Sequence, residues 1–147
     1  MRYSVERTLA APPAQVYAAW TVPRCFALWF GPRIFTAPPD RVVLDPRPGG
    51  AWQVTLVGEH GFEATLGGVY HEARAPARLV FTTDDALVTV TLTPAGDGTA
   101  LCFQHDGDTQ EHVRAAWLES LDRLTEHLGR RAGPAVAPPP GAATSRP

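Results

Sequence analysis

The stretch VTVTLTPAGDGTALCFQH, residues 88–105, decides the fold of this chain. Apolar and polar side chains alternate through it on both sides of a Gly-Asp-Gly sequence at residues 96–98. Successive side chains of a strand point to opposite faces, so this alternation predicts two strands with one covered face. The glycine-rich break predicts the turn that joins them into an antiparallel hairpin.

The same alternation recurs at four places upstream of the hairpin. We expect strands at residues 3–9, 53–57, 62–70 and 79–83. Glycine and aspartate clusters separate most of them, as at Gly49-Gly50, Gly58 to Gly61 and Asp84-Asp85. Short, regularly spaced strands with turn residues between them predict an antiparallel meander rather than parallel βαβ units.

A long amphipathic helix is predicted after the last strand, at about residues 109–131. Its apolar side chains recur every three or four residues, which is the pattern of one helical stripe. They are Val113, Trp117, Leu121, Leu124 and Leu128. Asp108 or Thr109 is expected to cap the start. About 20 residues at 1.5 Å rise give a rod of roughly 30 Å, long enough to lie across a sheet.

Two short helices are expected after the first strand, at residues 12–20 and 23–29. The order is then one strand, two short helices, five or six strands and the long helix. A curved antiparallel sheet must cover its apolar face, and the last helix is the element long enough to do so. We therefore expect an α+β fold in which a sheet of six or seven strands wraps around the C-terminal helix.

Composition and charge restrict the class of protein. The chain has 147 residues, 44% of them hydrophobic, and a formal net charge of −2. This is enough for one domain with a full core, and it argues against nucleic-acid binding and a polybasic membrane anchor. All 13 basic residues are arginine, which excludes chemistry that needs a lysine. Neither a signal peptide nor an apolar run near 18 residues is present, so we expect no membrane partner and a cytoplasmic location.

The chain is expected to divide near residue 131. Residues 1–131 form the predicted domain, whereas residues 132–147 are rich in proline and alanine and lack apolar periodicity. That composition predicts a disordered tail. The two cysteines, Cys25 and Cys102, are too few for a disulfide framework or a zinc site. No metal and no cofactor are expected.

Several short segments are similar, in the same order, to one known family. They are VERTL at 5–9, VYAAWT at 16–21, LWFGP at 28–32, RPGG at 47–50, GVYHE at 68–72 and RLVFT at 78–82. Over about residues 3–130 the chain resembles the START-like (SRPBCC) superfamily, in the subgroup of activator-of-heat-shock-protein-90-ATPase homologues. The resemblance implies a helix-grip fold with a hydrophobic cavity between sheet and C-terminal helix, and an association with stress responses. It implies no fixed chemistry, because the subgroup is functionally mixed.

The alternation and the resemblance together nominate residues that would line this cavity. They are Trp29, Phe30, Phe35, Trp52, Phe62, Tyr70, Phe81, Val90, Phe103, His105, Trp117 and Leu121. Large rings suit a wide apolar pocket, and each would serve equally well as ordinary core. The sequence leaves open whether the interior is hollow or filled.

Three polar residues have two readings each. His105 shares a face with Phe103, so it is either a partly buried, hydrogen-bonded histidine or a polar anchor or general base for a ligand. Arg47 either supports a turn or binds a ligand carboxylate at the cavity mouth. Glu63 would be notable if it faced the cavity, but alternation places it on the outer face.

The leading functional hypothesis is a protein that binds a hydrophobic, aromatic or polyketide-like small molecule between sheet and helix. No nucleophile stands in a recognisable motif, so we assign no catalytic residue. Two alternatives stay open: a cyclase- or hydrolase-like enzyme that uses His105 with Tyr70 or Glu72, and a chaperone-interacting module. The expected partner is a hydrophobic small molecule, and an exposed sheet edge leaves room for a homodimer.

Overall fold

A single curved antiparallel sheet and a long C-terminal helix dominate the computed structural model, which describes residues 2–84, 86–107 and 110–132. The strands are β1 Arg2–Leu9, β2 Val42–Leu44, β3 Ala51–Val57, β4 Glu63–Arg74, β5 Arg78–Thr83, β6 Ala86–Ala95 and β7 Gly98–Asp106. The helices are α1 Pro13–Thr21, α2 Pro23–Phe26 and α3 Glu111–Ala132, with short 3-10 turns η1 Pro39–Arg41 and η2 Glu59–Gly61.

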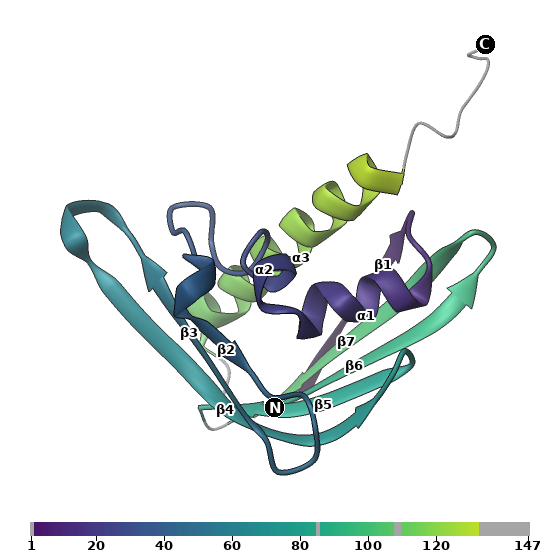
Figure 1. Cartoon of the computed structure of the whole chain (residues 1–147), viewed down its shortest axis with the longest axis horizontal. Coiled ribbons are helices and arrows are strands. Elements are labelled where there is room, and N and C mark those ends of the chain that lie inside the picture. Colours follow the sequence, from purple (N-terminus) through teal and green to yellow (C-terminus); the bar gives the residue numbers. More distant parts are fainter. Residues whose placement is uncertain (1, 85, 108–109, 133–147) are drawn as a thin grey trace.

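The seven strands follow the order β1-β7-β6-β5-β4-β3-β2. Strands β2 to β7 therefore form a meander, and β1 closes the sheet by pairing with the last strand along its whole length, from Arg2 opposite Asp106 to Leu9 opposite Thr99. The sheet bends into a trough, with α3 along its open side and the two shorter helices in the opening (Figure 1). This is the predicted helix-grip arrangement, and the fold prediction is confirmed.

Two details of the secondary structure differ from the predictions. Helix α2 ends at Phe26, three residues before the predicted end. Hydrogen-bonded turns continue beyond it, since the N–H of Leu28 donates to the carbonyl of Cys25 and that of Phe30 to the carbonyl of Phe26. Strand β2 was not recognised in the sequence, since its three residues are too few to show an alternation. The predicted caps Asp108 and Thr109, and the predicted tail after residue 132, lie outside the described residues.

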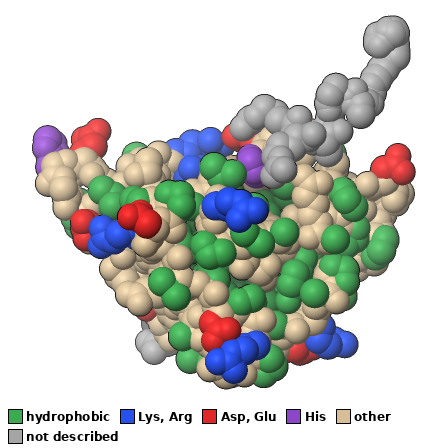
Figure 2. All heavy atoms as spheres, viewed as in Figure 1, with side chains coloured by type: hydrophobic (Ala, Val, Ile, Leu, Met, Phe, Trp, Pro, Cys, Tyr) green, Lys and Arg blue, Asp and Glu red, His purple; other side chains and the backbone are tan. Residues whose placement is uncertain are grey.

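The apolar stripe of α3 faces the trough as predicted. Trp117, Leu121, Leu124 and Leu128 are all buried, and Val113 is half-buried at the start of the helix. They meet the side chains of the concave face of the sheet and of α1 and α2 in one continuous core. On the face seen in Figure 2, acidic and basic side chains are interspersed among apolar ones rather than gathered by sign.

Two glycines allow close approaches that shape the sheet. A Cβ at Gly68 on β4 would lie 2.0 Å from the carbonyl oxygen of Thr82, and one at Gly50 would lie 2.0 Å from that of Asp45. Gly49 also adopts a positive φ of 86°. The pair Gly49-Gly50 therefore serves the backbone of the turn before β3, as the sequence suggested.

Candidate functional site: a cavity between the sheet and helix α3

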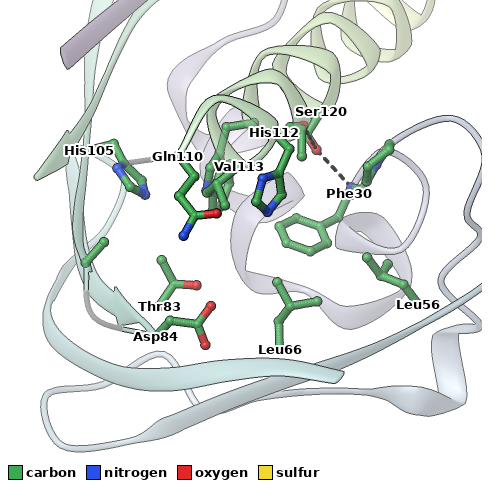
Figure 3. A pocket seen from close by; sticks show the side chains of 15 residues that line it. Phe30, Leu56, Leu66, Thr83, Asp84, His105, Gln110, His112, Val113 and Ser120 are labelled. Atoms are coloured by element: carbon green, nitrogen blue, oxygen red, sulfur yellow. Dashed lines mark hydrogen bonds between the residues drawn. The ribbon is translucent and has the colours of Figure 1, made fainter. Parts of the chain in front are cut away.

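A cavity of about 330 Å³ lies between the sheet and the N-terminal half of α3 (Figure 3). Its walls come from the loop after α2, from β3, β4 and β7, from the β5–β6 turn and from α3. The lining residues are Phe30, Gly31, Pro32, Leu56, Leu66, Thr83, Asp84, Ala86, His105, Gln110, His112, Val113, Ala116, Trp117 and Ser120.

One end of the cavity is apolar. Phe30, Leu56 and Leu66 lie together on one side of the view in Figure 3, and we call them the apolar end. Trp117 continues this wall from α3, where its ring contacts Phe30 at a centroid distance of 5.5 Å and Phe103 at 4.9 Å. Only 6% of Trp117 is exposed. These rings and aliphatic side chains present an apolar surface to anything that enters.

The other end carries polar groups. Thr83 is the last residue of β5 and Asp84 follows it in the β5–β6 turn, and Gln110 and His105 lie opposite them (Figure 3). We call these four residues the polar end. Asp84 has a positive φ of 51°, a conformation that aspartate and asparagine adopt more readily than most residues. A ligand that spans the cavity would thus meet apolar surface at one end and hydrogen-bonding groups at the other.

His105 is the most deeply buried of the polar residues that line the cavity, with 1% of its surface exposed. Its ring stacks on Tyr3, with centroids 5.2 Å apart, and lies 6.4 Å from Trp117. Burial lowers its pKa, and the nearby charge of Asp106 opposes this only in part. His105 is therefore neutral at neutral pH and adds no positive charge to the cavity.

The loop that forms one wall is tied to α3 by two side chains. The backbone N–H of Gly31 donates to Oγ of Ser120 at 3.0 Å, and Nη1 of Arg123 donates to the carbonyl oxygen of Gly31 at 2.8 Å. Ser120 itself donates to the carbonyl of Ala116 on the preceding turn. These bonds fix the position of Phe30 and Pro32 relative to the helix.

The twelve residues nominated from the sequence fall into separate groups. Phe30, His105 and Trp117 line the cavity. Trp52, Tyr70 and Phe81 instead surround a void of about 10 Å³ that is closed by Trp20 and Phe26. The remaining buried ones lie in the core, outside the cavity lining: Trp29, Val90, Phe103 and Leu121.

Two nominated rings lie away from both voids. Phe35 and Phe62 pack on each other at 5.8 Å, next to the turn before β4, and Phe62 is 58% exposed. Strand β4 begins only at Glu63, so the alternation read through Phe62 extends one residue too far. Phe62 consequently follows the turn and does not share the inward face of Leu66.

The cavity contains polar residues that sequence reasoning did not single out, namely Thr83, Asp84, Gln110 and His112. They stand in a turn and at the start of a helix, where polar residues are ordinary. One signal was present: the β5–β6 turn and the start of the long helix follow strands that run towards the same end of the sheet. Strand pairing of Leu87 with Asp106 brings the two connections together.

The other charged candidates are engaged outside the cavity lining. Arg47 pairs with Asp45 two residues earlier, with Nε 2.9 Å from Oδ1. Glu63 accepts two hydrogen bonds from Arg41 on the outer surface, at 3.1 and 3.3 Å. The guanidinium of Arg41 lowers the pKa of Glu63. Both residues therefore have structural partners.

Within the described ranges 2–84, 86–107 and 110–132, no three His, Cys, Asp or Glu side chains gather closely enough to hold a metal ion. Within the same ranges, no helix has the length and apolar character needed to cross a membrane.

Comparison with known proteins gives a consistent family match. The family model described as Activator of Hsp90 ATPase homolog 1-like protein matches residues 10–129. No curated protein sequence matches the chain significantly.

Solved structures share the fold over most of their length. A protein from Chromobacterium violaceum is 28% identical with a TM-score of 0.78, covering 88% of this chain and 98% of its own. An AHSA1-like protein from Aeromonas hydrophila is 23% identical with a TM-score of 0.80, covering 89% and 94%. An AHSA1 protein from Silicibacter pomeroyi is 22% identical with a TM-score of 0.76, covering 89% and 99%. At the latter two identities the likeness shows the fold alone.

Proposed function

The chain belongs to the family of Activator of Hsp90 ATPase homolog 1-like proteins, and we propose that it binds a hydrophobic small molecule in the cavity between the sheet and α3. The observation that carries the proposal is the cavity itself. At about 330 Å³ it lies at the lower end of the range of about 300–1,000 Å³ that small-molecule sites occupy. A mono- or bicyclic compound suits this size better than a large polyketide.

The composition of the walls supports a specific site. Apolar and aromatic side chains with a few convergent polar groups are typical of sites that bind small molecules. Here Phe30, Leu56, Leu66 and Trp117 provide the apolar surface, and the polar end provides the groups that would orient a ligand.

The aromatic residues under α1 and α2 pack closely, which also supports the proposal. The second void, about 10 Å³, is comparable to the space of one water molecule. Protein interiors are normally close-packed, so a hollow of about 330 Å³ beside a packed region is unusual. A cavity maintained in one place while the aromatic residues beside it pack closely is consistent with a binding role.

The proposal can be tested by filling the cavity. Ala116 faces it from α3, so Ala116→Trp would place an indole in the space. Val43 on β2 is 62% exposed, and Val43→Trp adds the same group at the surface as a matched control. We would titrate the full chain with N-phenyl-1-naphthylamine, an uncharged dye whose emission rises in apolar surroundings, and record native mass spectra of each purified protein.

We expect saturable dye binding by the unchanged chain and by Val43→Trp, and at least tenfold weaker binding by Ala116→Trp. A co-purified compound in the native spectrum should likewise disappear only in Ala116→Trp. Equal dye binding by all three proteins would mean that the dye binds elsewhere. If the native mass spectrum also shows the protein without any bound compound, the two results together would refute the proposal.

A further inference from the structure

The formal charges at the cavity indicate which ligands it accepts. Among the 15 described residues that line it there is no arginine, and Asp84 is the single carboxylate of that set. None of the ion pairs among the described residues involves Asp84. The inference drawn here rests on the proposed function and specifies the ligand of that same cavity.

The arginines of α3 and of the loop bonded to it whose contacts the structure defines already have partners. Arg114 lies over the ring of Tyr3, with Cζ 4.9 Å from the centroid. Arg123 donates to the carbonyl oxygen of Gly31, and Arg33 pairs with Glu126. A carboxylate at the polar end would therefore meet the like charge of Asp84 and no arginine among the described lining residues, which is unfavourable.

The geometry of the cavity suits a positive group at one end. The amide of Gln110 points across the polar end towards Thr83 and Asp84, and the carboxylate of Asp84 points into the cavity (Figure 3). A carboxylate accepts hydrogen bonds and donates none, so Asp84 prefers a donor, and an ammonium group supplies both donors and charge. An apolar ring bound against Phe30, Leu66 and Trp117 would bring a short amine substituent towards this end.

We propose that the cavity is selective for small aromatic amines over aromatic acids, with the ring at the apolar end and the ammonium group at Asp84. The selectivity is moderate, because Asp84 is exposed and water screens its charge. We expect a protonated amine to bind about fivefold more tightly than its uncharged analogue at low salt. The corresponding acid should bind more weakly than both.

Three probes of the same ring system test this order: 2-(1-naphthyl)ethylamine, 2-(1-naphthyl)ethanol and 1-naphthaleneacetate. Their dissociation constants would be measured by calorimetry on the full chain at pH 7 in 20 mM and 500 mM NaCl. The preference for the amine over the alcohol should shrink at high salt, since the Debye length falls to about 3–5 Å.

Asp84→Asn removes the charge and keeps a side chain that tolerates the positive φ of 51° at this position. This substitution should abolish the difference in affinity between the amine and the alcohol, and it should leave the dissociation constant of the alcohol unchanged. Asp97→Asn is the matched control, because Asp97 lies in the β6–β7 turn, at the opposite end of that hairpin from His105. It should leave the order of all three probes unchanged.

The outcomes separate this inference from the proposed function. If the acid binds as tightly as the amine, or Asp84→Asn leaves the amine preference intact, the charge selectivity is refuted while the cavity proposal stands. If none of the three binds but the neutral dye does, small aromatic amines are refuted as the ligand class. If Ala116→Trp weakens the binding of neither the dye nor any of the probes, the proposed function itself is refuted.

Discussion

Replacing Trp117 by alanine tests how the interior is divided between packed core and open cavity. Its ring has two different neighbourhoods: Phe103 and Phe30 contact it at 4.9 and 5.5 Å, whereas the cavity adjoins it elsewhere. A tryptophan packed on all sides and one that lines empty space differ in the contacts they lose on truncation.

The expected cost follows from these contacts. Truncation of a fully packed Phe or Trp to alanine costs about 3–5 kcal/mol, of which part is the cavity left behind. Trp117 is 6% exposed, so nearly all of its apolar surface is removed from water on folding. One side of the Trp117 ring already borders the cavity, so the space left by its removal would join that cavity. We therefore expect a loss of stability at the lower end of this range, about 3 kcal/mol. In urea, at an m-value of about 2 kcal/mol/M, the midpoint should fall by about 1.5 M.

Urea unfolding monitored by far-UV circular dichroism measures this cost without depending on the lost indole. Leu121→Ala is the packed control, since Leu121 is fully buried on the same helix and does not line the cavity, and it should cost about 2–5 kcal/mol. Val113→Ala is the lining control and should cost about 1 kcal/mol or less, because Val113 is half-buried. If Trp117→Ala lowers the free energy of unfolding by less than about 1 kcal/mol while Leu121→Ala lowers it strongly, Trp117 is not packed against the core as described.

Three further predictions concern stability. Burial lowers the pKa of His105, so its imidazole is protonated near pH 6.5 in the unfolded chain but only at lower pH in the folded chain. The free energy of unfolding should therefore fall as the pH drops below about 6.5, and urea titrations of His105→Gln should show a weaker dependence on pH. Arg123→Met removes the hydrogen bond to the Gly31 carbonyl and should cost about 1.5 kcal/mol in the same assay, and an unchanged midpoint would mean that the loop is held by other contacts. Gly68→Ala should lower the melting temperature sharply, because its Cβ would meet a carbonyl oxygen at 2.0 Å, whereas Gly129→Ala on α3 has open space and should raise it slightly.

The main elements of the fold were predictable because periodicity reports directly on which face is covered. The strands at residues 88–93 and 101–105, and the helix with Trp117 and Leu121 on one stripe, follow from spacing alone. Strand β2 was missed because three residues, Val42 to Leu44, are too short to show a period. The end of α2 at Phe26 was missed because turn hydrogen bonds continue through Phe30, and the first helix-ending residue of the sequence, Gly31, comes only after them.

The candidate site was less predictable, because alternation assigns a side chain to a face but not to a hollow or a filled region. Tyr70 and Phe81 point inward, yet Trp20 from α1 comes against them and leaves only about 10 Å³. The polar end depends on the meeting of two connections, at residues 83–84 and 110. That meeting is visible only once β6 and β7 are aligned.

The pairing of the first strand with the last affects how the chain can fold as it is made. The ion pair between Arg2 and Asp106 spans 104 residues, so β1 has no partner until β7 has been synthesised. At about 5–20 residues per second, that delay is about 5–20 s. During this time the meander can form hairpin by hairpin, whereas β1 and the apolar side of α1 are exposed to water and to other chains. Folding on the ribosome should therefore be governed by this late, high-contact-order closure, and β1 is the segment through which a nascent chain would associate wrongly or recruit a holding chaperone.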